Sequence, residues 1–164
     1  MNGKDKHASE KGFTNKEAFE GSFTKEEVET HFIKEWERGF KLLCKLPNLF
    51  PDALAYLMDE TCISNEELAY KAWLDVRTIQ RLRTDVEQNP TLTTIVKICL
   101  ALELPMAVSE IMVSKAGKKF RVGTVDMAYH HLLTWCVGYD LQECNEIIEK
   151  MNKRYPLFKQ QKKK

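Results

Sequence analysis

The chain has 164 residues, of which 43% are hydrophobic and 30% charged, a composition that predicts one globular core and excludes disorder of the whole chain. The formal net charge is +1, so only local clusters of charge can favour a polyanionic partner. No run of about 18 apolar residues exists and the N-terminus lacks the apolar stretch of a secretory signal, so we expect a cytoplasmic protein without membrane contact.

Two segments precede the centre of the chain. Residues 1–25 are rich in Lys, Glu, Gly and Ser, and we expect a disordered arm. Residues 26–47 are expected to form an amphipathic helix that ends at Pro47. Its apolar residues recur at spacings of three and four: Val28, Phe32, Trp36, Phe40 and Leu43. Because an aromatic stripe of this kind is usually core, we expect Phe32, Trp36 and Phe40 to be buried.

Capping patterns predict the next two helices. One helix follows Pro51, since proline suits the first turn of a helix. Ser64 and Glu67 have the spacing of a capping box, in which each side chain satisfies a free N–H at the helix start. This box predicts a helix from Asn65 that stops around Trp73.

Similar signals continue toward the C-terminus. Asp75 is the predicted N-cap of a helix from Val76 to about Arg83, and Thr91 is the predicted N-cap of an apolar helix. A further helix follows Pro105 and stops at Gly117, because glycine favours the left-handed conformation at helix ends.

The sequence beyond residue 120 predicts a helical hairpin. Thr124 is expected to cap its first helix and Gly138 to end it, and the D-x-x-E box of Asp140 and Glu143 to open its second. The final residues, "FKQQKKK", carry four lysines and no acid, and we expect a solvated basic tail. No segment has the alternation of a strand, so the predicted class is all-α.

The predicted helix at Val76 carries a basic outward face. Between residues 71 and 83 there are four cationic residues against one acid, Asp75. The face that points away from the apolar seam contains Val76, Arg77, Gln80 and Arg81. A surplus of positive charge of this kind favours contact with a phosphate backbone.

Residues 63 to 117 resemble the helix-turn-helix domain of the lambda-repressor-like family, which includes Cro, phage repressors and xenobiotic response element proteins. The resemblance covers about a third of the chain, or nearer half if the preceding helix from Pro51 is counted. It is carried by the S-x-E-E-L-A pattern of residues 64–69, by the small Ala69, by Ile79 and Leu82, and by "NPTLTTIVKICLALEL". It implies a five-helix fold whose second motif helix lies in the major groove of double-stranded DNA, with dimers on paired half-sites.

The resemblance also implies roles for individual residues. Those that fall where the family reads bases, or beside that position, are Val76, Arg77, Gln80 and Arg81. Those that fall near phosphates are Asn65, Thr78, Arg83, Thr84 and Thr91. An arginine here could donate two hydrogen bonds to guanine, and Val76 could meet a thymine methyl. The expected function is that of a sequence-specific transcriptional regulator that acts without a cofactor.

One residue departs from the family. Trp73 stands where the family usually has glycine, and a left-handed backbone would cost a non-glycine residue about 1 kcal/mol. Trp73 is then either an apolar staple over the motif or the cause of a reshaped turn. In the second case the chain is a helical protein-interaction module that keeps the fold without DNA binding. Asp75, Asp85 and Glu87 flank the basic face and would repel phosphate.

The sequence thus divides into five parts: an arm (1–25), an amphipathic helix (26–47), a helix-turn-helix domain (48–120), a helical hairpin (121–155) and a basic tail (156–164). The hairpin folds back on the first helix or dimerises. Because family members commonly append a dimerisation element at this place, we expect a homodimer.

Other constellations are weak. His130, His131, Cys136 and Cys144 lack the ligand spacing of a zinc site, so we infer no metal. No catalytic or phosphate-loop motif is present, and we infer neither an enzyme nor a small-molecule ligand. The five cysteines are an odd number without a C-x-x-C pair, which predicts reduced, packed thiols.

Overall fold

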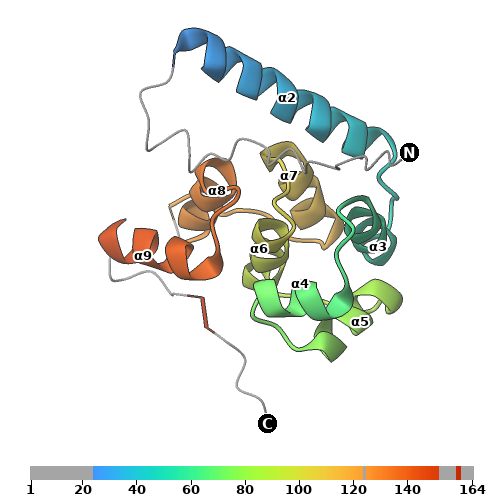
Figure 1. Ribbon diagram of the computed structural model, residues 1–164. Coiled ribbons are helices and arrows are strands. Elements are labelled where there is room, and N and C mark those ends of the chain that lie inside the picture. Colours follow the sequence, from blue (N-terminus) through green and yellow to red (C-terminus); the bar gives the residue numbers. More distant parts are fainter. Residues whose placement is uncertain (1–23, 124, 152–157, 160–164) are drawn as a thin grey trace, which may run out of the picture.

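The computed structural model describes residues 24–123, 125–151 and 158–159. This part of the chain is all-helical, with eight helices and no strand. The helices are α2 (Lys25–Cys44), α3 (Phe50–Glu60), α4 (Asn65–Lys71), α5 (Val76–Thr84), α6 (Leu92–Ala101), α7 (Met106–Lys115), α8 (Asp126–Trp135) and α9 (Leu141–Met151) (Figure 1). None of the described helices is long and apolar enough to cross a membrane.

Helix α6 is the centre of the fold, with α4, α7, α8 and α9 packed around it (Figure 1). Every residue from 95 to 101 is buried, so α6 is buried all round and not on one side only. Thr91 caps it as the sequence predicts, since its hydroxyl accepts a hydrogen bond from the Thr94 N–H at 3.2 Å.

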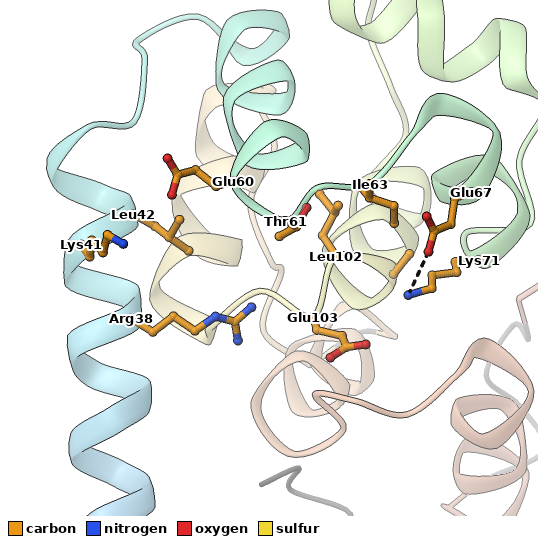
Figure 2. Close-up of a pocket in the computed structure, with 11 residues that line it drawn as sticks. Arg38, Lys41, Leu42, Glu60, Thr61, Ile63, Glu67, Lys71, Leu102 and Glu103 are labelled. Carbon is orange, nitrogen blue, oxygen red and sulfur yellow. Dashed lines mark ion pairs between the residues drawn. The ribbon is translucent and has the colours of Figure 1, made fainter. Parts of the chain in front are cut away.

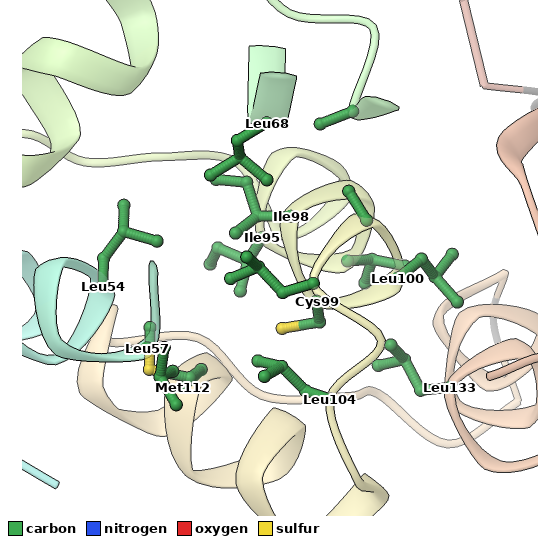
Figure 3. Close-up of a cluster of buried hydrophobic side chains, with 14 of the residues drawn as sticks. Leu54, Leu57, Leu68, Ile95, Ile98, Cys99, Leu100, Leu104, Met112 and Leu133 are labelled. Carbon is green, nitrogen blue, oxygen red and sulfur yellow. The ribbon is translucent and has the colours of Figure 1, made fainter. Parts of the chain in front are cut away.

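A single apolar core joins the central helices to the C-terminal hairpin. Figure 3 shows side chains from α3, α4, α6, α7 and α8 meeting in one cluster. Leu54, Leu68 and Ile95 have no exposed surface, and Leu133 and Leu104 are 1% exposed. Burial of each such side chain stabilises the fold by roughly 1.5 to 3 kcal/mol. The parts 48–120 and 121–155 therefore share one core.

Helices α8 and α9, which form the predicted hairpin segment, both pack on α6, and α8 also packs on α7; α2 is not a main partner of either helix. The predicted capping box of α9 is confirmed: the Glu143 N–H donates to Asp140 at 2.8 Å, and the Asp140 N–H donates to Glu143 at 3.0 Å. Thr124, the expected cap of α8, lies outside the described residues. Leu132 and Ile148 of the hairpin are buried within this chain.

The expected burial of the aromatic residues of α2 is wrong. Phe32, Trp36 and Phe40 are 68%, 60% and 56% exposed. The helix contacts α7 through a different edge, where Gly39 and Leu42 are buried. A side chain at Gly39 would begin 3.4 Å from Pro105 Cβ, so this glycine permits the close approach. The aromatic stripe consequently lies away from the core.

The expectation of a wholly solvated tail is also wrong, at Phe158. This residue is 3% exposed, and its ring stacks on Tyr129 with the centroids 5.5 Å apart. The Asn145 side chain accepts from the Phe158 N–H at 2.8 Å and donates to its carbonyl at 3.1 Å. Lys97 Nζ donates to the Lys159 carbonyl at 2.7 Å. These side chains hold Phe158 and Lys159 on the surface of α6, α8 and α9. The other tail residues, 156–157 and 160–164, lie outside the described part.

The cysteines divide into two groups, all of them free. Cys99, Cys136 and Cys144 are buried, as expected for packed thiols, whereas Cys44 and Cys62 are exposed. The prediction of packing is therefore wrong for the two exposed cysteines, each of which lies at or just beyond the end of a helix.

Candidate nucleic-acid interface

Helices α4 and α5 form a compact pair, and α5 also packs on α3. The side of α5 that faces the core buries Ile79 and Leu82. Ala69 is 2% exposed, which agrees with a small residue at a close approach between helices. The predicted cap of α5 is confirmed, since Asp75 accepts from the Arg77 N–H at 2.8 Å. The sequence thus orients α5 through two buried residues and one cap.

The cap of α4 matches only half of the predicted box. The Ser64 hydroxyl accepts from the Glu67 N–H at 3.1 Å. The Glu67 carboxylate lies 3.8 Å from Lys71 Nζ, in an i,i+4 ion pair, and does not close the box.

The turn between α4 and α5 is made by Trp73 in the left-handed conformation, with φ of 51°. The Leu74 N–H donates to the Ala69 carbonyl at 2.9 Å, and the Trp73 N–H donates to the Tyr70 carbonyl at 3.2 Å. These two bonds define a Schellman motif, the usual glycine-containing end of a helix. Trp73 therefore adopts the left-handed conformation that glycine favours.

Two other positions show that this chain tolerates such strain. Cys62 after α3 and Glu103 after α6 have φ of 53° and 52°, and Gly117 after α7 has φ of 68°. A non-glycine residue in this region costs about 1 kcal/mol. At Trp73 the packing of the half-buried side chain against the core offsets this cost.

The outward face of α5 presents hydrogen-bond donors to solvent. Arg77, Gln80 and Arg81 are exposed, and Val76 is half-buried. Within the described part of the chain, neither Arg77 nor Gln80 has a side-chain hydrogen bond or ion pair. The structure thus places the four predicted base-reading residues on a single helix, with Arg77 and Arg81 one turn apart.

Two of the predicted phosphate-contacting residues contact each other. Arg83 Nη1 donates to Asn65 Oδ1 at 2.9 Å, which ties the end of α5 to the start of α4. Arg83 Nε is buried without a hydrogen-bond partner among the described residues. The link joins positions 18 residues apart, and no local pattern in the sequence could reveal it.

The three threonines predicted to lie near phosphate have different environments. The Thr84 hydroxyl donates to the Gln80 carbonyl at 2.9 Å, within α5. Thr91 is the cap of α6 and its hydroxyl lies 2.9 Å from that of Thr94. Thr78 is half-buried. All three lie on α5 or at the start of α6.

Asp85, one of the flanking acids, accepts two hydrogen bonds. Asp85 accepts from Gln88 Nε2 at 2.8 Å and from the Glu87 N–H at 3.0 Å. These bonds, together with the charge of Arg81, lower the pKa of Asp85, so it is ionised at neutral pH. Its charge partly offsets that of Arg81 at the C-terminal end of α5.

A groove of about 400 Å³ separates α2 from α4 and the turn after α6 (Figure 2). Its charged lining residues are Arg38, Lys41, Lys71, Glu60, Glu67 and Glu103. Three cations against three carboxylates leave no net charge, so the groove favours neither an anionic nor a cationic ligand. Sequence reasoning missed it because its walls come from segments far apart in the chain.

The histidine and cysteine side chains that lack zinc-site spacing in the sequence make other contacts in the structure. His130 Nε2 lies 3.2 Å from a Glu110 carboxylate oxygen. A hydrogen bond between Cys136 and Cys144 lowers the pKa of Cys136 and raises that of Cys144. In the described ranges no three His, Cys, Asp or Glu side chains converge on a position for a metal ion.

Comparisons with family models, with curated proteins and with solved structures gave no match to this chain. The arrangement of α4 and α5, and the side chains on α5, are therefore the basis for inferring a function.

Proposed function

We propose that this protein is a sequence-specific DNA-binding transcriptional regulator of the helix-turn-helix type, with α5 in the major groove. It acts in the cytoplasm, without a cofactor, by occupying an operator. The observation that supports this most is the exposed, side-chain-unpaired Arg77 and Gln80 beside Arg81 on a helix whose opposite side is fixed in the core. The five helices α3 to α7 have the number that the lambda-repressor-like resemblance implies.

The chemistry of α5 suits base reading. Two guanidinium groups one helical turn apart can each form paired hydrogen bonds to guanine, and the methyls of Val76 can contact thymine. Asn65, Thr78, Arg83, Thr84 and Thr91 are the proposed phosphate contacts. The Asn65–Arg83 bond would brace the two helices for this contact by fixing their ends. The left-handed backbone of Trp73 supports the proposal, because it is the conformation that a glycine would adopt in this turn.

The test is selection of bound sequences from random DNA duplexes across a salt series, followed by the same measurement on Arg77→Ala and Arg81→Ala. We expect an enriched motif, a steep loss of affinity with salt, and roughly 5- to 150-fold weaker binding with relaxed base preference in each variant. Lys41→Ala is the matched control, because Lys41 is an exposed cation of α2, a helix on the opposite side of the molecule from α5 (Figure 1). Absence of enrichment, or arginine variants that bind like the control, would contradict the proposal.

A second candidate is a helical protein-interaction module that does not bind DNA. The observation that favours it is the exposed aromatic side of α2. It predicts that neither arginine variant changes any DNA affinity, whereas substitution on α2 changes an association between proteins.

A further inference from the structure

Five large apolar side chains lie exposed along α2, and we call them the α2 stripe. Its members are Val28, Phe32, Ile33, Trp36 and Phe40, between 53% and 68% exposed. Trp36 and Phe40 stack with their ring centroids 5.4 Å apart. A continuous apolar surface on a water-exposed helix marks a contact site.

Within residues 24–123, 125–151 and 158–159, the fold does not use the stripe. The edge of α2 that meets the rest of the chain contains Gly39 and Leu42, and it packs on α7. Pro105 lies against Gly39 at this edge. Exposure of the stripe residues to water is therefore unfavourable in free energy. A second surface that covered them would remove this cost.

The charges of α2 identify the kind of surface. Glu26, Glu27 and Glu29 outnumber Lys25 and Lys34 in residues 25–34, which carry a net charge of −1 with histidine neutral. Residues 35–44 carry two acids, Glu35 and Glu37, and two bases, Arg38 and Lys41; with Lys45, the C-cap that follows α2, the C-terminal half has a net charge of +1. The acids along the helix disfavour an anionic lipid surface. Because the two halves carry opposite net charges, they favour an antiparallel copy of the same helix. In that arrangement the negative half of each copy lies beside the positive half of the other, and the two helix dipoles point in opposite directions.

We propose that the α2 stripe is a homodimer interface, on which α2 of a second copy packs antiparallel about a two-fold axis near Trp36. Such an interface is self-complementary, because Phe32 of each copy meets the Phe40 region of the other. Helix α5 lies at the far side of the molecule from α2, so the proposed DNA face stays uncovered (Figure 1). The proposal does not depend on DNA binding.

The first test is the sedimentation mass of the full chain. The monomer mass is 19.1 kDa, and we expect twice this value at about 50 μM protein. Trp36→Glu and Phe32→Glu should each weaken dimerisation at least about tenfold. Trp135→Glu on α8 is the control, because Trp135 is 58% exposed, close to the 60% of Trp36, and should leave dimerisation unchanged. Thermal unfolding of the variants confirms that each is folded.

Two outcomes would overturn the proposal. One is a monomer at every concentration up to about 100 μM; if Trp36→Glu also destabilises that monomer, another part of the same chain covers the stripe. The other is a dimer that Trp36→Glu and Phe32→Glu leave intact, which places the interface elsewhere.

The second test fixes the orientation. Glu26 and exposed Cys44 are 18 residues apart, five turns of a helix, so they lie on the same side of α2. In a Cys62→Ser background, Glu26→Cys should form an intermolecular disulfide between the introduced thiol and Cys44 of the second copy. A cross-link that joins only Cys44 to Cys44 would show parallel helices, and no cross-link in a dimer would place α2 outside the interface; either result contradicts the proposal.

Discussion

Phe32 and Phe158 are both aromatic residues in charged segments, near the two ends of the described chain, and their environments are opposite. Phe32 belongs to a regular stripe and is 68% exposed, whereas Phe158 precedes a run of polar and basic residues and is 3% exposed. The difference lies in the backbone. Asn145 binds the N–H and the carbonyl of Phe158, while α2 satisfies its own backbone and is oriented by the edge at Gly39. Periodicity shows which residues share a face but not what covers that face.

The largest expected effect separates the two phenylalanines directly. Phe158→Ala should lower the free energy of unfolding by about 3 kcal/mol, because it removes a buried ring and leaves a cavity beside Tyr129. Phe32→Ala should change it by less than about 0.5 kcal/mol, since the ring is exposed. Urea unfolding at about 1 μM protein measures both, at a concentration low enough to suppress self-association. Equal effects for the two residues would refute the contrast.

A smaller loss of stability should follow when the Phe158 ring is kept and the Asn145 side chain that binds its backbone is removed. Asn145→Ala deletes both hydrogen bonds to Phe158 and should cost about 1 to 3 kcal/mol, because the buried N–H and carbonyl lose their partner. Hydrogen exchange of the Phe158 amide should accelerate in parallel. Gln142→Ala, at an exposed position on the same helix, is the control. A protected Phe158 amide in Asn145→Ala would show that stacking alone holds the segment.

Local chemistry made part of this fold predictable. Thr91, Asp75 and the box of Asp140 and Glu143 cap helices where the sequence places them, because a cap and its N–H partners lie within one turn. The exposure of Arg77 and Arg81 was likewise predictable, since the buried positions of α5 fix its opposite side.

Features of the structure that depend on contacts between residues far apart in the sequence were not predictable. The bond from Arg83 to Asn65 and the hydrogen bond from Lys97 to Lys159 join residues 18 and 62 positions apart. The burial of every residue from 95 to 101 in α6 arises from the helices that pack around it, which no pattern within α6 specifies. The backbone conformation of Trp73 could not be predicted for a related reason, because only the packing of its side chain against the core offsets the strain of positive φ.

The smallest expected effect concerns Lys97, which is 5% exposed and holds the Lys159 carbonyl. Burial lowers the pKa of its ammonium group below the ordinary value of 10.5. Between the lowered pKa and 10.5 the unfolded chain binds more protons than the folded chain, so the free energy of unfolding should rise with pH across this window. Below the lowered pKa both states are protonated and the full cost of burying the charge is present.

The comparison to make is with Lys97→Met. The difference in unfolding free energy, wild type minus variant, should become more positive from about pH 8 to about pH 10, by less than about 1 kcal/mol. Urea unfolding at the two pH values measures it, and differences between variants cancel the titration of other groups. Lys41→Met, at an exposed lysine of α2, is the control. The same slope in both variants would mean that Lys97 is as solvated as Lys41, and so that Phe158 and Lys159 are not held against α6.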